Sequence, residues 1–148
     1  MPNEIKLSKS WIAEKILAET VITDVIGSGN DAKLFYEQAD QDSDDDYVII
    51  RYVDNSIRGK LGHRRHGVSC IFDIVAYQKN GTANMKTVAD QLDDMFSFYA
   101  NEIFQTYYFT SEIEGLISNE ERGVKDKDIW YSQGGTYRIR VSPVGGSG

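Results

Sequence analysis

Residues 68–78 of this 148-residue chain read VSCIFDIVAYQ, a run dominated by β-branched, aromatic and other apolar residues. Such a run predicts a central β-strand. Alternate side chains of a strand point to opposite faces, so one face would hold Val68, Cys70, Phe72, Ile74 and Ala76. The other would hold Ser69, Ile71, Asp73, Val75 and Tyr77. Because both faces carry apolar residues, we expect helices against one face and a second chain against the other.

Four further segments have the composition of strands. They are 33–39 (KLFYEQA), 47–53 (YVIIRYV), 107–117 (YYFTSEIEGLI) and 136–142 (TYRIRVS). Within 107–117, alternation predicts a shared side for Phe109, Ser111, Ile113 and Ile117.

Two segments repeat apolar residues at helical spacing. The first runs from about Ser10 to Val21, with Ser8 or Ser10 as its N-terminal cap. Its apolar stripe consists of Ile12, Ala13, Ile16, Leu17 and Val21. The second follows the Asn80-Gly81 turn and is capped by Thr82 or Asn84. Its apolar positions are Met85, Val88, Ala89, Leu92, Phe96 and Tyr99.

These elements predict an α+β fold with the order α-β-β-β-α-β-β. Two helices would pack on one side of a mixed or antiparallel sheet of about four to five strands. The chain length suits a single domain, which we assign to residues 1–143, followed by a flexible tail at 144–148.

The composition narrows the class of protein. A formal charge of −7 argues against general binding to nucleic-acid phosphates. No apolar run approaches the roughly 20 residues of a membrane-spanning helix, and the N-terminus is too polar for a signal peptide. The single cysteine, Cys70, rules out an internal disulfide framework and is expected to be buried. We therefore expect a soluble protein made in the cytosol, with no cofactor and no membrane partner.

The connection between the strands at 47–53 and 68–78 is basic. It holds Arg58, Lys60, Arg64 and Arg65, together with His63 and His66. Such a loop either docks on an acidic partner or nucleic-acid backbone, or is a solvated hairpin tip. The two histidines have no third ligand nearby in sequence, and flanking arginines would repel a cation, so no metal site is predicted.

An acidic run precedes the strand at 47–53. It consists of Asp40, Asp42, Asp44, Asp45 and Asp46. The run does not fit the twelve-residue calcium-binding loop that would begin at Asp40. That loop needs glycine at its sixth position, where this chain has Asp45, and glutamate at its twelfth, where it has Arg51. The run is either a solvated loop or a source of negative potential.

Trp130 and Tyr131 precede a QGG sequence that predicts a turn, and the pair is either core or an exposed interface anchor. No spacing of serine, histidine, cysteine or carboxylate residues indicates catalysis, so no catalytic residue is assigned and no enzyme is expected.

The order of these segments resembles the tail terminator proteins of long-tailed phages, also called tail-completion or tail-to-head joining proteins. The helix SWIAEKILAETVI, the strands YVIIRYV and HGVSCIFDIVAYQ, the helix TANMKTVADQLDDMF and the ending TYRIRVSP carry the resemblance. It covers about Ser8 to Pro143, and the best local match is Gly67–Phe96. The acidic run and the long segment Asn101–Asp128 depart from shorter members of the family.

The resemblance implies a non-enzymatic virion protein at the head-proximal end of the tail, present in the host cytoplasm during assembly. It would form a homohexameric ring that caps the tail tube, binds the tube protein and the head-completion or neck protein, and lets DNA pass without specific binding. Either the aspartates at 40–46 would then face the lumen, or the basic residues at 58–66 would meet an acidic surface of the tube or neck. The alternatives are another neck, head-completion or tail-tube protein, or a small binding module that uses residues 58–66.

Overall fold

The structure is a computed structural model, and it describes residues 3–38, 46–61, 64–122 and 128–143. The elements are α1 (Asn3–Leu17), α2 (Thr20–Ile26), a short 3-10 turn (Gly29–Asp31), β1 (Leu34–Tyr36), β2 (Tyr47–Leu61), β3 (Arg64–Lys79), α3 (Ala83–Phe96), β4 (Phe98–Phe104), β5 (Tyr107–Arg122) and β6 (Ile129–Pro143). The α+β class is confirmed. The predicted order α-β-β-β-α-β-β, with two helices and four to five strands, is matched only roughly, since the described residues form three α-helices and six strands.

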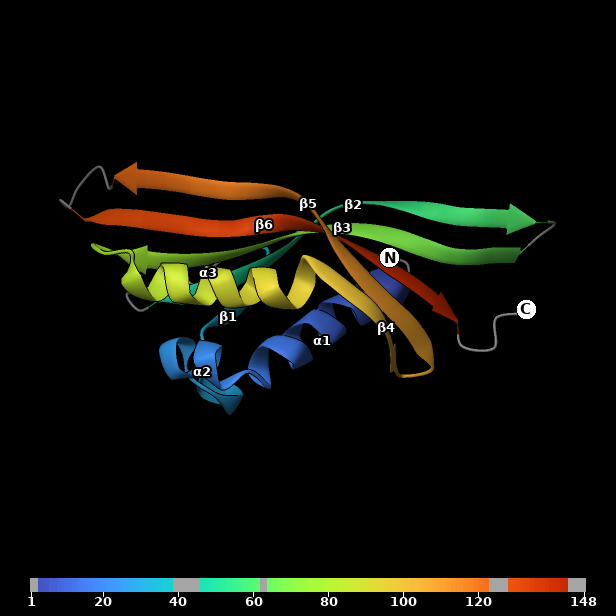
Figure 1. Cartoon of the computed structure of the whole chain (residues 1–148), viewed down its shortest axis with the longest axis horizontal. Coiled ribbons are helices and arrows are strands. Elements are labelled where there is room, and N and C mark those ends of the chain that lie inside the picture. Colours follow the sequence, from blue (N-terminus) through green and yellow to red (C-terminus); the bar gives the residue numbers. More distant parts are fainter. Residues whose placement is uncertain (1–2, 39–45, 62–63, 123–127, 144–148) are drawn as a thin grey trace.

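The six strands form one mixed sheet in the order β1-β2-β3-β6-β5-β4. Only β1 runs parallel to its neighbour β2, and the other pairs are antiparallel. The helices lie together on one side of the curled sheet (Figure 1). The sheet therefore has a helix-covered face and an opposite face, which we call the outer face.

The core lies between the helices and the covered face of the sheet. From β3 it takes the face that holds Cys70, whose burial was predicted, and this face consists of Val68, Cys70, Phe72, Ile74 and Ala76, all buried. Trp11 of α1 is also buried, and its ring stacks on Phe109 at 5.0 Å and meets the edge of Phe96 at 5.7 Å. Large aromatic rings thus join the first helix to both α3 and the sheet.

The first helix differs from the prediction. It begins at Asn3 and ends at Leu17, and Ser8 lies inside it, donating to the Glu4 carbonyl at 2.7 Å instead of capping. The backbone of Glu19 is extended (φ −99°, ψ 112°), so the first helix is interrupted there and α2 begins as a separate helix. This break turns Leu17 and Val21 away from the core, and they are 37% and 40% exposed. The prediction of one helix with a continuous apolar stripe as far as Val21 is therefore wrong.

The end of the chain was also predicted incorrectly. The QGG sequence is not a turn, because Gly134 and Gly135 lie within β6. A Cβ at Gly134 would lie 2.1 Å from the Ile74 carbonyl oxygen, and one at Gly135 would lie 2.8 Å from the Tyr137 ring. Gly134 therefore lets β6 pass close to the backbone of β3, and Gly135 leaves space for the Tyr137 ring to lie over β6.

Two other errors involve β4 and β5. Tyr99 belongs to β4 and not to the helix, which ends at Phe96. β5 continues to Arg122, and its register shifts between Ile113 and Gly115. This bulge moves Ile117 to the outer face, away from the buried Phe109, so the predicted shared side was wrong.

The basic connection is not an irregular loop. β2 continues through Leu61 and β3 begins at Arg64, with Arg58 opposite Gly67 and Lys60 opposite Arg65. Alternating polar residues do not suggest a strand, but the flanking strands impose their register on this segment.

Candidate functional site

The outer face of the sheet has an aromatic cluster over β1, β2, β3 and β6. The rings of Tyr47 and Tyr77 stack with centroids 4.8 Å apart, and Tyr47 also lies 5.3 Å from Trp130 and 5.8 Å from Phe35. Burial raises the pKa of Tyr47 to about 12, so its hydroxyl stays neutral at ordinary pH. The cluster is a rigid, neutral surface with polar tips, the kind of surface found at protein interfaces.

Beside this cluster the outer face has a hollow of about 180 Å³. It is lined by Ile49, Arg51, Asp73, Val75, Tyr77, Ile117, Asn119 and Ser132. Ile49 and Val75 line this hollow on the outer face and are each only 6% exposed. The floor of the hollow is therefore apolar and its rim is polar.

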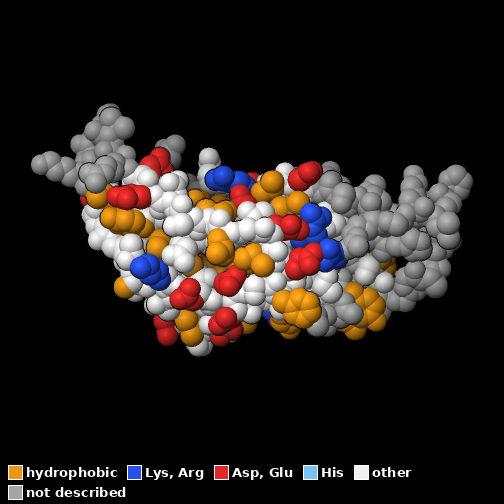
Figure 2. Space-filling model, turned by 45° about the horizontal axis from the view of Figure 1, so that its top comes forward, with side chains coloured by type: hydrophobic (Ala, Val, Ile, Leu, Met, Phe, Trp, Pro, Cys, Tyr) orange, Lys and Arg blue, Asp and Glu red, His pale blue; other side chains and the backbone are white. Residues whose placement is uncertain are grey.

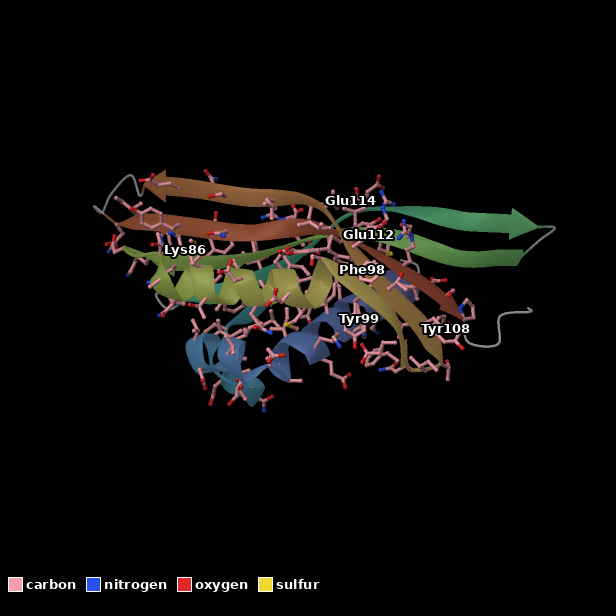
Figure 3. The ribbon with its side chains drawn as sticks, viewed as in Figure 1. Lys86, Phe98, Tyr99, Tyr108, Glu112 and Glu114 are labelled. Atoms are coloured by element: carbon pink, nitrogen blue, oxygen red, sulfur yellow. The ribbon has the colours of Figure 1, made fainter. Side chains whose placement is uncertain are left out.

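Charged side chains occupy the middle of the outer face. Arg138 pairs with Glu114 and also donates to the Ser69 hydroxyl at 2.8 Å, and Arg140 pairs with Glu112. Figure 2 shows acidic and basic side chains side by side there, with hydrophobic ones between them. Phe98 lies opposite Glu112 in the β4–β5 pair (Figure 3) and is 77% exposed.

The far end of the β2–β3 hairpin extends beyond the rest of the sheet. β6 pairs with β3 only as far as Val68, so residues 57–61 and 64–67 form a two-stranded ribbon in the described part of the chain. We call this segment the basic ribbon, since it contains four arginine or lysine residues and no acidic one. Figure 1 shows this end of β2 and β3 beyond the helices.

A cleft of about 380 Å³ lies on the helix-covered side, between α1, the end of α3 and β4. It is lined by Trp11, Glu14, Lys15, Ala18, Glu19, Asp94, Met95, Tyr99, Glu102 and Phe104. We call it the helix-side cleft. Its walls are aromatic, and four of its lining residues are carboxylates against one lysine.

Two hydrogen bonds hold Glu102 in the helix-side cleft. The Trp11 indole donates to its carboxylate at 2.7 Å, and the Lys15 ammonium donates to the same oxygen at 3.0 Å. Lys15 also lies 4.0 Å from the centroid of the Tyr99 ring. Burial opposes the charge on Lys15, but hydrogen bonds with Tyr99 and Glu102 outweigh it and raise the pKa of Lys15. The cleft therefore favours a cation.

The structure places the predicted site residues on separate surfaces. Arg58, Lys60, Arg64 and Arg65 lie on the basic ribbon. Trp130 joins the aromatic cluster, whereas Tyr131 packs against the core. Asp46 accepts a hydrogen bond from Asn84 at 2.9 Å, and Asp40, Asp42, Asp44 and Asp45, like His63 and residues 144–148, lie outside the described residues.

The helix-side cleft was not predicted from the sequence. Its residues come from α1, α3 and β4, and β4 was itself unforeseen. The available signal was weak: Glu14 and Lys15 lie beside the apolar stripe of α1, but nothing in the sequence connects them with Glu102.

No protein-family model matches this sequence, and a search of curated proteins finds no significant relative. Within the described ranges, no helix is long and apolar enough to cross a membrane. The same part of the chain contains no group of three or more histidine, cysteine or carboxylate side chains placed to hold a metal ion.

Proposed function

We propose that this chain is a phage tail terminator, which assembles as a ring on the end of the tail tube. The observation that carries the proposal is the outer face of the sheet, which none of the described helices covers and which holds the aromatic cluster beside an apolar hollow. Aromatic residues are enriched at interfaces between proteins, so this face suits a protein that acts through assembly.

In this proposal the ring contains about six copies, as in the resembling family, and each contact joins two different surfaces of the chain. The ring binds the last ring of the tube protein, presents no surface for another tube subunit, and offers its other side to the head-completion protein. DNA passes through the lumen without specific binding, and the net charge of −7 opposes adhesion of its phosphates. The protein would lie at the head-proximal end of the virion tail and in the host cytoplasm during assembly.

The proposal is tested by adding the protein to a tail-tube protein that is polymerising. We expect tube growth to stop at a length set by the time of addition, with extra density at one tube end in electron micrographs. The outer-face variant Tyr77→Glu should stop growth less well, because it places a charge in the apolar cluster. Lys86→Glu, on the exposed side of α3 (Figure 3), is the control and should act like the unaltered protein. Unchanged tube lengths with the unaltered protein would contradict a capping role.

A binding module is the second candidate, and the basic ribbon favours it. If the ribbon binds nucleic acid, affinity for DNA should fall steeply with salt and be lost in Arg64→Ala plus Arg65→Ala. Absence of DNA binding at moderate salt would exclude this candidate. A tail-tube or neck protein of similar fold is distinguished by growth, because a tube protein extends its own polymer and a terminator ends it.

A further inference from the structure

We propose that the hollow on the outer face receives the side chain of a tyrosine from the tail-tube protein. The inference rests on the proposed function and deepens it, because it names the contact that the outer face would make with the tube. Three rows of cross-strand neighbours, one apolar and two polar, line the hollow.

The middle row forms the apolar floor. It runs across β2, β3, β6 and β5 through Ile49, Val75, Gly134 and Ile117. Gly134 has no side chain, so a space remains in this row between Val75 and Ile117, both of which line the hollow. A floor of this kind favours an apolar group, because the group leaves water when it binds there.

The second row places a cation beside a carboxylate. Arg51 lies directly opposite Asp73, and Asp73 lies opposite Thr136. The Thr136 hydroxyl donates to Asp73 Oδ1 at 2.6 Å, whereas Arg51 has no hydrogen bond or ion pair with any described residue. A guanidinium that donates next to a carboxylate that accepts suits a neutral group that does both, such as a hydroxyl.

The third row adds a buried hydroxyl and an aromatic wall. Tyr77, Ser132 and Asn119 are cross-strand neighbours, and all three line the hollow. Ser132 is only 7% exposed, and within the described ranges its hydroxyl has no hydrogen-bond partner. Because a buried polar group without a partner is costly, a bound polar group would remove that cost. The Tyr77 ring, which stacks on Tyr47, supplies the wall.

The size of the hollow selects a single side chain as its occupant. Its volume is about 180 Å³. Sites for drug-sized molecules and cofactors are larger, at about 300 to 1,000 Å³. Among side chains, tyrosine combines an aromatic body for the floor and wall with a hydroxyl for the polar rows, and it is enriched among the residues that dominate binding at protein interfaces. Phenylalanine would leave the polar groups unpaired, and a charged side chain would meet a like charge at Arg51 or Asp73.

The tube protein is a better source of this tyrosine than a second copy. The tyrosines in the core or packed against it are Tyr52, Tyr99, Tyr107, Tyr131 and Tyr137. Tyr47 and Tyr77 stack on each other. A second copy therefore offers only Tyr36 and Tyr108 of the nine tyrosines, and Tyr36 already has the Lys9 ammonium 5.9 Å from its ring centroid. The outer face is also the surface that the proposed function gives to the tube.

Two neutral compounds that differ by one hydroxyl test the hollow directly. N-acetyltyrosinamide and N-acetylphenylalaninamide are each titrated into the full chain, and NMR signals of the Ile49 and Val75 methyl groups report binding. We expect the tyrosine compound to bind at least about fivefold more tightly, because the phenylalanine compound leaves polar groups of the site unpaired. Equal affinities, or unchanged methyl signals with both compounds, would overturn the inference.

Two variants remove different polar groups of the hollow. Ser132→Ala and Arg51→Leu should each weaken binding of the tyrosine compound at least about threefold and change that of the phenylalanine compound by less than about twofold. Phe98→Ser is the matched control, because Phe98 is exposed on the outer face but does not line the hollow. Each variant is first checked for an unchanged melting temperature. An unreduced preference for tyrosine in a folded Ser132→Ala or Arg51→Leu protein would contradict the assigned contacts.

The tube experiment separates this inference from the proposed function. If the unaltered protein caps tubes and Arg51→Leu caps them equally well, only the contact in the hollow is refuted. If the compounds bind as expected but the unaltered protein does not cap, the proposed function fails, and the tube protein fails with it as the source of the tyrosine. Self-association that is lost in Tyr36→Phe or Tyr108→Phe would assign the hollow to a second copy and overturn the tube protein as the partner.

Discussion

Gly134 is a residue at which the sheet leaves no room for a larger side chain. A Cβ there would lie 2.1 Å from the Ile74 carbonyl oxygen, a backbone atom that cannot move aside. We therefore expect Gly134→Ala to lower the free energy of unfolding by on the order of 3 kcal/mol. Gly115→Ala is the matched control in the neighbouring strand, since a Cβ at Gly115 meets no atom within 4 Å. Equal urea denaturation midpoints for the two variants would contradict the close passage of β6.

The Cys70 thiol is expected to make the free energy of unfolding decrease at high pH. Burial raises the pKa of its thiol from 9.0 to about 11. The folded state therefore holds the proton more tightly than the unfolded state, and this contribution is complete below pH 9.0 and is lost as the pH rises through about 11. Urea denaturation over this range should show a smaller loss of stability in Cys70→Ala than in the unaltered protein. Parallel curves for the two proteins would show that the thiol does not contribute.

At the scale of elements, β3 has one face in the core and one on the outer face. Ile74 is fully buried among the helices, whereas Ile71 points to the other side and is partly exposed. We expect Ile74→Asp to abolish cooperative unfolding, with a loss above about 4 kcal/mol, because it buries an unpaired charge. Ile71→Asp should cost far less. A normal melting curve for Ile74→Asp, followed by circular dichroism, would mean that the faces are reversed.

The central elements were predictable because their patterns are local. The alternation in residues 68–78 identified the buried face of β3, and the helical spacing from Met85 to Phe96 identified α3. β4 was missed because Phe98–Phe104 is too short and mixed to signal a strand by itself, and its pairing with β5 creates it. Gly134 and Gly135 predicted a turn because adjacent glycines are a turn signal in sequence. The structure needs them for a different reason, the close approach of β3 and of the Tyr137 ring, which only the folded chain creates.

At the scale of the whole molecule, half of the candidate site was visible in the sequence. The basic residues of the ribbon stand out as a charge cluster, although their strand conformation does not. The helix-side cleft brings Glu14 and Lys15 of α1 together with Glu102, which lies in a distant part of the sequence. No spacing rule connects these residues, because their contact depends on how α1 packs against β4.

The same molecule carries three surfaces whose chemistry suits assembly: the outer face, the basic ribbon and the helix-side cleft. The ribbon is basic in sequence and the cleft is lined mainly by carboxylates among its charged residues, and both are separate from the outer face. In the proposed ring, each copy would need surfaces for its neighbouring copies and other surfaces for the tube and head-completion proteins.

Light scattering over a concentration series, with negative-stain images of the same fractions, tests the central claim of a closed assembly most directly. The account predicts rings of about six subunits whose mass stays constant once formed, either in solution or on purified tube ends. Filaments that lengthen with concentration, or a monomer that remains alone even on tube ends, would contradict it.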